Sequence, residues 1–128
     1  MTSADGRYTL VLNGEIYNYQ ALKRDLPPQE WRTGTDTEVI LAALIHHGPA
    51  ALSRFNGMFA LALWDNREKQ LLLARDRMGI KPLYVARLGE HLAFASEVRT
   101  LLACPGVERR LNREALVHYF TYMTAYGR

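Results

Sequence analysis

Cysteine is almost absent from this chain of 128 residues, in which Cys104 is the only one. A single thiol excludes an internal disulfide and is typical of proteins kept in a reducing compartment. The sequence also lacks an apolar run long enough to cross a bilayer. Its first ten residues do not have the charged-then-apolar layout of a signal peptide. We therefore expect a cytoplasmic protein that has no membrane partner.

Charge of one sign is not concentrated in any segment. The net charge is +3 and the sequence pI is about 9.2, but the arginines are scattered along the chain. The tightest group, Arg109, Arg110 and Arg113, is more typical of a solvated helix end than of a nucleic-acid-binding patch. We expect no nucleic-acid partner.

Internal repeats and low-complexity linkers are missing as well. With 128 residues, 48% of them hydrophobic, the chain can bury one core but not two. The sequence therefore predicts a single domain over residues 1–128.

The first third of the chain predicts a strand followed by a helix. Residues 9–12 have the pattern of a short buried strand, and Asn13-Gly14 is the dipeptide most tolerant of the positive φ of a turn. Asn18 is placed to cap a helix that continues to about Leu26, where a Pro-Pro pair prevents further turns.

The middle of the chain predicts a second helix and a fully covered strand. Thr35 and Glu38 fit a capping box of the form T-x-x-E, which opens an amphipathic helix that ends at Gly48. Residues 58–64 are apolar at every position, which indicates a strand covered on both faces.

Four strands at the spacing of an antiparallel meander are predicted for residues 58–64, 70–76, 82–88 and 92–96. A helix over residues 97–104 follows, and Asn112 caps a last helix over residues 113–123. Helices packed against a mostly antiparallel sheet give an α+β fold class.

An Asn-Gly pair alone is typical of a hairpin turn, and the chain has a second pair at residues 56–57. An ordered series of motifs is more specific: NGEIYNYQAL, TDTEVILAAL, GMFALALWD, LLLARDRMGIKPLYVA and FASEVRTLL. The series covers nearly the whole chain and resembles the glutamine-hydrolysing domain of the asparagine synthetase family, a class II glutamine amidotransferase. The resemblance implies the N-terminal-nucleophile hydrolase fold, an αββα sandwich, here incomplete at the N-terminus.

The resemblance assigns roles to four residues. Amide hydrolysis passes through an intermediate with negative charge on the former carbonyl oxygen, which preorganised N–H groups stabilise. In the family these donors are the side chain of Asn13 and the backbone N–H of Gly14. Glu15 and Asp36 are assigned to the α-ammonium group of glutamine. The alternative is that Asp36 only favours a helix dipole and that Glu15 is an ordinary surface acid.

Two further groups have simpler interpretations. Tyr17 and Tyr19 are expected to be packing residues rather than ligands. Arg75, Asp76 and Arg77 form either a surface ion-pair cluster or, by the resemblance, a loop that shapes the pocket and faces a synthetase domain.

The nucleophile of the family is an N-terminal cysteine whose own α-amine acts as the base. Cys104 precedes Pro105 at a predicted helix end, and we expect it to be a buried small hydrophobe. Thr2 would become N-terminal if Met1 were removed, but it lies just before the strand that leads to Asn13, whereas the nucleophile of the family lies far upstream. The family arginine that binds the glutamine α-carboxylate is also absent. We therefore expect no glutaminase activity from this chain alone.

As a function, the resemblance implies hydrolysis of glutamine to glutamate and ammonia for the ATP-dependent amidation of aspartate. ATP and Mg²⁺ are expected in a synthetase domain absent from this chain. We expect no cofactor or metal in the present domain. One alternative is a non-catalytic interaction module, and another is a relative similar to β-lactam synthetase without glutaminase activity. Intact Asn13, Gly14, Glu15 and Asp36 argue against a scaffold. Sheet edges left exposed by a partial domain predict a homodimer or a higher assembly.

Overall fold

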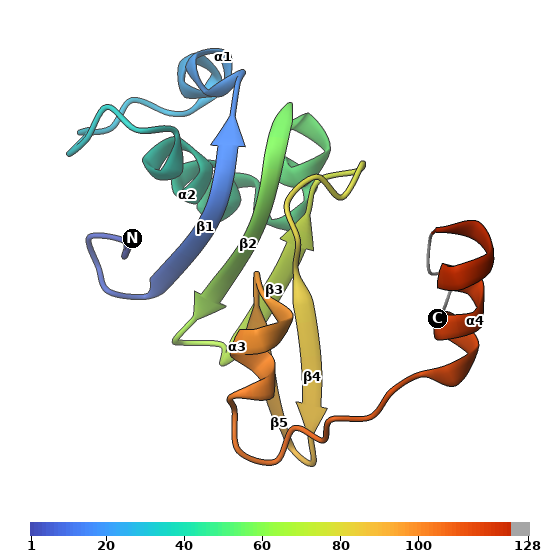
Figure 1. Cartoon of the computed structure of the whole chain (residues 1–128). Coiled ribbons are helices and arrows are strands. Elements are labelled where there is room, and N and C mark those ends of the chain that lie inside the picture. The colour runs from blue at the N-terminus through green and yellow to red at the C-terminus, as the bar shows by residue number, and fades with distance from the viewer. Residues whose placement is uncertain (124–128) are drawn as a thin grey trace.

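The computed structural model describes residues 1–123 (Figure 1). Within them, the strands are β1 (Tyr8–Ile16), β2 (Gly57–Asp65), β3 (Gln70–Arg75), β4 (Tyr84–Leu88) and β5 (His91–Ala95). The helical segments are α1 (Tyr19–Asp25), α2 (Asp36–His47), the 3-10 helix η1 (Gly48–Arg54), α3 (Val98–Leu102) and α4 (Arg113–Tyr122). No helix within residues 1–123 is long and apolar enough to cross a membrane.

The strands of the described region form two antiparallel sheets rather than one. β1, β2 and β3 pair in that order, and Asn13 lies opposite Ala60, which in turn lies opposite Arg75. β4 and β5 pair only with each other. The predicted four-strand meander is therefore wrong at one connection, because residues 76–83 leave the first sheet in a folded loop instead of a tight turn.

β1 is longer than the sequence predicts. It runs straight through Asn13-Gly14, where a turn was expected, and Gly14 pairs with Phe59. Gly14 has a φ of +137°, and a Cβ at this position would lie 2.0 Å from the carbonyl oxygen of Met58. The glycine is thus required because two backbones approach closely inside a sheet.

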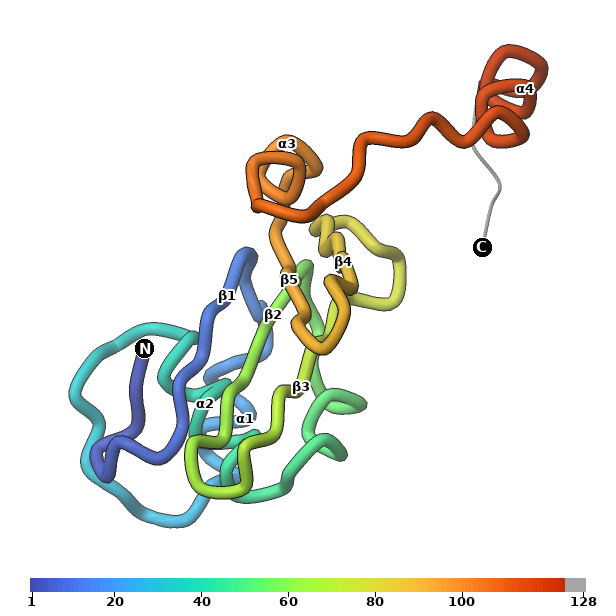
Figure 2. Tube along the Cα trace, turned by 90° about the horizontal axis from the view of Figure 1, so that it is seen from below, coloured from blue at the N-terminus to red at the C-terminus, as the bar shows by residue number. Residues whose placement is uncertain are grey.

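The main core lies between the first sheet and the helices α1 and α2. Leu10 and Ile16 of β1 and Leu61 of β2 are fully buried against Val39 and Ile40 of α2. Figure 2 shows α1 and α2 on one side of this sheet, and β4, β5 and α3 on the other. This order of helices, sheet, sheet and a short helix confirms the predicted αββα arrangement.

β2 is buried on both faces, as its continuous apolar sequence predicts. Phe59, Leu61 and Leu63 face the helices, whereas Ala60 and Ala62 face the second sheet and are only 4% and 5% exposed.

The segment before α2 is fixed by an acidic side chain. α2 begins at Asp36 as expected, but Thr35 makes no side-chain capping bond. Glu38 is buried and accepts hydrogen bonds from the N–H groups of Arg32 (2.9 Å) and Thr33 (2.7 Å). The predicted capping box is therefore wrong, because Glu38 binds the preceding loop instead of the first residue of the helix.

Asn18 also binds a distant segment instead of its own helix. Its side chain donates to the carbonyl oxygen of Arg54 (2.9 Å) and accepts from the N–H of Asn56 (3.0 Å), and it makes no capping bond to α1. This residue ties the start of α1 to the segment that enters β2.

The C-terminal helix α4 forms where the sequence predicts it. The side chain of Asn112 accepts from the N–H of Ala115 at 3.0 Å, which confirms the cap. No residue of α4 is buried, and the helix stands apart from the rest of the described chain in Figure 1. Phe120, which belongs to its predicted apolar face, is 74% exposed.

Core packing on β2 should govern stability. We expect Leu61→Ala, which removes a side chain that is 1% exposed, to lower the free energy of unfolding by about 2–5 kcal/mol. Leu71→Ala on β3 is the matched control, because its side chain is 37% exposed, and should cost about 1 kcal/mol or less. Urea unfolding followed by circular dichroism measures both. Equal losses for the two variants would contradict this placement of the core.

Candidate functional site

Asn13 lies on the face of β1 that is turned toward the second sheet. Side chains alternate along a strand, and Leu10 and Ile16 face the helices, so Asn13 and Glu15 share the opposite face. The Nδ2 atom of Asn13 donates to the Oγ of Ser96, which follows β5, at 3.0 Å. The two polar side chains line a cavity of about 140 Å³ between the sheets whose other lining residues are apolar.

The backbone N–H of Gly14 points to the outer edge of β1. Its partner Phe59 uses both its N–H and its carbonyl oxygen to bind Asp76, on the side away from β1. Gly14 and Phe59 are therefore a non-hydrogen-bonded pair, which turns the N–H of Gly14 outward. Within residues 1–123 this N–H has no hydrogen-bond partner.

The outer edge of β1 is occupied on both sides of this position. Toward its start, the N–H and carbonyl oxygen of Leu10 bond to Met1 at 2.8 and 2.7 Å. Toward its end, the N–H of Ile16 donates to the Oδ2 of Asp36 at 2.9 Å. The open part of the edge is thus a short window centred on Leu12 and Gly14.

Asp36 and Glu15 lie next to this window. Asp36 is the first residue of α2, and its bond to the N–H of Ile16 places the carboxylate one residue beyond Glu15. The Oδ1 atom of Asp36 also accepts from the hydroxyl of Thr37 at 3.3 Å. Glu15 is exposed, and its carboxylate has no partner among the described residues. The four residues named from the sequence therefore gather around the end of β1.

The candidate nucleophiles do not join this cluster. Thr2 pairs with Thr9 at the start of β1, about 14 Å along the strand from Asn13. Cys104 follows α3, where its N–H donates to the carbonyl oxygen of Leu101. Its side chain is half-buried rather than buried as predicted, because it sits at the end of a short helix instead of within a packed core.

The two tyrosines beside the site differ. Tyr19 packs against the main core, as expected. Tyr17 is 56% exposed, so its interpretation as a packing residue is wrong. Its backbone N–H instead donates to the carbonyl oxygen of Asn56, which holds the chain in place between β1 and α1.

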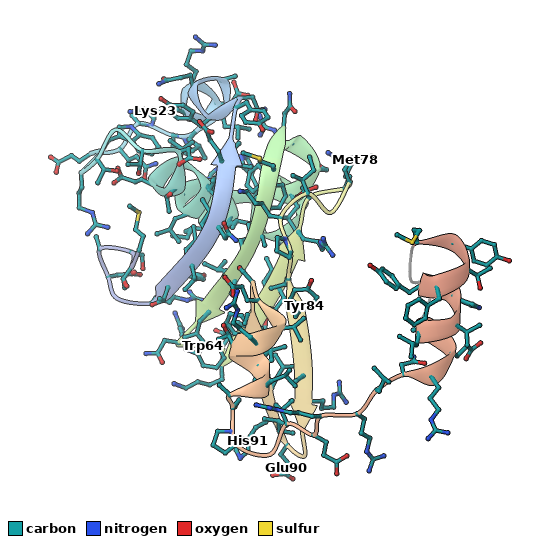
Figure 3. All side chains as sticks on the ribbon, in the orientation of Figure 1. Lys23, Trp64, Met78, Tyr84, Glu90 and His91 are labelled. Carbon is teal, nitrogen blue, oxygen red and sulfur yellow. The ribbon has the colours of Figure 1, made fainter. Side chains whose placement is uncertain are left out.

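The loop between β3 and β4 is organised by one carboxylate. Asp76 is 5% exposed and accepts from the N–H groups of Lys81 (3.0 Å), Ile80 (2.9 Å) and Phe59 (3.2 Å). The hydrogen bond from the N–H of Lys81 has the largest effect in holding the pKa of Asp76 below its usual value. The hydrogen bonds from the N–H groups of Ile80 and Phe59 act in the same direction. At the tip of the loop, Met78 is 84% exposed (Figure 3).

The ion-pair interpretation of this loop is wrong for its arginines. The guanidinium groups of Arg75 and Arg77 donate to the carbonyl oxygens of Gly79 and Ser53, and neither pairs with a carboxylate in the described residues. They brace the loop, which with η1 encloses a cavity of about 440 Å³. The signal for such a loop in the sequence was an aspartate, Asp76, followed three residues later by a glycine.

A protein-family model described as "Glutamine amidotransferase domain" matches residues 1–127. A putative glutamine-hydrolysing asparagine synthetase of Mycobacterium tuberculosis is 44% identical over 122 residues, which are 91% of this chain and 19% of that protein. Asparagine synthetase 2 of Bacillus subtilis is 41% identical over 113 residues, which are 88% and 15%. The chain thus spans less than a fifth of the length of these relatives.

Among solved structures, a glutamine phosphoribosylpyrophosphate amidotransferase from B. subtilis, complexed with ADP and GMP, is similar. The TM-score is 0.65 at 25% sequence identity, and the match covers 79% of this chain and 24% of the other. The likeness therefore extends over most of this chain and about a quarter of a much longer one.

The carboxylate of Asp76 should make stability depend on pH. Because its pKa is lower in the folded than in the unfolded chain, its contribution is complete above the unfolded value of about 3.9 and is lost as the pH falls toward the folded value. We expect Asp76→Asn to lower the urea midpoint at pH 7 and to make its decline below about pH 4 shallower. Asp25→Asn at the exposed end of α1 is the control and should change the midpoint at pH 7 much less. An Asp76→Asn variant with the parental midpoint at pH 7 would contradict the role of this carboxylate.

Proposed function

We propose, because this chain belongs to the glutamine amidotransferase domain family, that the window at the edge of β1 is a binding site for glutamine. The membership confirms the family expected from the sequence motifs. One observation carries the proposal: the unpartnered N–H of Gly14 lies between two side chains that share a face, an amide donor at Asn13 and a free carboxylate at Glu15.

Two N–H donors of this site suit a developing oxyanion. The N–H of Gly14 points outward from the strand, and Asn13 contributes a carboxamide nitrogen from the adjacent position. Fixed donors of this kind stabilise the charge of a tetrahedral intermediate without having to reorient during the reaction. We assign Asn13 and Gly14 to the side-chain amide of glutamine on this ground.

The two acids suit the other end of the same molecule. An α-ammonium group needs acceptors, and a carboxylate offers about four lone-pair sites. Asp36 uses part of this capacity on Ile16 and Thr37, while Glu15 keeps all of it. Glu15 is therefore the main ammonium partner in the proposal, and Asp36 is a second one that also fixes the end of β1.

In a longer protein, such a domain would supply ammonia to a synthetase domain. The relatives are named asparagine synthetases, so we propose aspartate amidation with ATP and Mg²⁺ as the reaction of the whole enzyme, with the synthetase domain as the partner of this one. One alternative is a non-catalytic amidotransferase-like module, and the position of Cys104 outside the site is compatible with it. Binding of glutamine discriminates the two, because a scaffold has no need of a site for it.

Titration with glutamine tests the site directly. We expect glutamine to shift the backbone amide resonances of residues 13–18, and Glu15→Gln to weaken its affinity about fivefold to tenfold by removing a charge-assisted bond. Glu90→Gln is the control, because Glu90 lies in the exposed turn between β4 and β5 (Figure 3). Glutamine should remain unhydrolysed in these samples. An absence of shifts, or equal effects of both variants, would disprove the proposed site, and release of glutamate would disprove the expected inactivity of this chain alone.

Exposed apolar surface supports the proposal that the isolated chain forms a homodimer. Val11 is 60% exposed on the sheet face beside β5, and part of the β1 edge is unpaired. At micromolar concentration, light scattering should give about twice the 14.6 kDa mass of one chain. Val11→Lys should shift the mass toward the monomer, whereas Val117→Lys, at a position 62% exposed on α4, should not. A monomeric mass for the unsubstituted chain would exclude the dimer.

A further inference from the structure

One side-chain hydrogen bond connects the two sheets at the candidate site. The Nδ2 atom of Asn13 donates to the Oγ of Ser96 at 3.0 Å, across 83 positions of sequence, and the bond is partly buried. Ser96 has no other hydrogen bond among the described residues, so its oxygen serves Asn13 alone. None of the roles assigned above includes Ser96.

The chemistry of a carboxamide makes such a contact consequential. The nitrogen and oxygen ends of an asparagine side chain have almost the same shape, but the nitrogen carries two donor hydrogens and the oxygen only accepts. An amide turned by 180° would present its oxygen to the developing oxyanion of a substrate and repel it. The nitrogen end must therefore be selected before substrate binds.

We propose that Ser96 is a positioning residue, which accepts one hydrogen of the Asn13 amide and thereby holds the nitrogen end in place with its second hydrogen free. The use of that second hydrogen for glutamine rests on the function proposed above, whereas the orientation of the amide does not. Ser96 acts through Asn13 and makes no contact with the substrate in this proposal.

The surroundings of the bond favour this role. The cavity around it is lined otherwise by apolar residues, including Val11, Ala60 and Phe94, so no other side chain in its lining competes for the Asn13 amide. The bond is partly buried, and a lower local dielectric strengthens a hydrogen bond relative to one at the surface.

The position of Ser96 is set by the elements on either side of it. β5 ends at the preceding residue, where Ala95 pairs with Tyr84, and Glu97 is the N-cap residue of α3. The orientation of the Asn13 amide therefore depends on how the second sheet sits on the first.

The side-chain amide resonances of Asn13 provide the test, in the absence of glutamine. In the unsubstituted chain we expect two well-separated Hδ2 resonances, one of which exchanges slowly with solvent. Ser96→Ala should bring their shifts together and accelerate exchange of the slow hydrogen about fivefold, the factor expected for one lost neutral hydrogen bond. Ser96→Thr keeps the hydroxyl and should restore the separation. Ser53→Ala, an exposed serine of η1, is the matched control and should leave Asn13 unchanged.

The outcomes separate this inference from the proposed function. Unchanged Asn13 side-chain resonances in Ser96→Ala, or no recovery in Ser96→Thr, would overturn the positioning role even if glutamine binds. A changed and recovered signature supports the role even if glutamine fails to bind, in which case only the proposed function falls. If Ser96→Ala does not fold, Ser96→Cys keeps the size of the side chain with a weaker acceptor, and an unperturbed Asn13 amide in that variant would overturn the role equally.

Discussion

The pairing of β1 with β2 is the constraint on which the rest of the molecule depends. Its register runs without a bulge from Tyr8 opposite Asp65 to Ile16 opposite Gly57. An uninterrupted register fixes which side chains face the helices and which face the second sheet, because a slip of one residue would exchange the two sets. It also fixes the direction of every backbone N–H. The outward N–H of Gly14 and the inward side chain of Asn13 are both consequences of this one register.

Carboxylates that bind backbone N–H groups hold the surrounding loops in place. Glu38 fixes the segment before α2, Asp76 fixes the loop after β3, and Asp36 fixes the end of β1. In each case the acid satisfies N–H groups that no strand or helix partner reaches, which would otherwise be costly to bury. The same arrangement distinguishes Glu15, because it is the acid next to the site that binds no backbone group. Its free carboxylate is what makes it available to a ligand.

Local patterns predicted the elements well and their partners poorly. The apolar run of β2, the stop of α1 before the Pro-Pro pair and the Asn112 cap depend on neighbouring residues and were predicted correctly. Glu38 and Asp76 bind groups chosen by the tertiary fold, so a capping box and an ion-pair cluster were inferred where backbone anchors exist. In the sequence, residues 76–83 look like an ordinary connection between strands. Their loop is shaped by an acid whose burial only the tertiary fold reveals. The site residues came from the family resemblance, and their roles stay predictions.

The candidate site and self-association of the chain compete for the same groups if association uses the outer edge of β1. A strand added there would take the N–H of Gly14 as one of its ladder bonds, since that group lies between the positions bonded to Met1 and Asp36. The N–H would then be unable to stabilise an oxyanion. The bond from Met1 and the side chain of Asp36 limit the open window to two outward-facing residues, Leu12 and Gly14, which is too short for a stable added strand. The apolar face around Val11 leaves that N–H free, because its side chains project away from the edge, but the side chains of Asn13 and Glu15 project from the same face. Association and glutamine binding are therefore compatible only in a dimer that buries the surface around Val11 and leaves both the N–H of Gly14 and the carboxylate of Glu15 exposed.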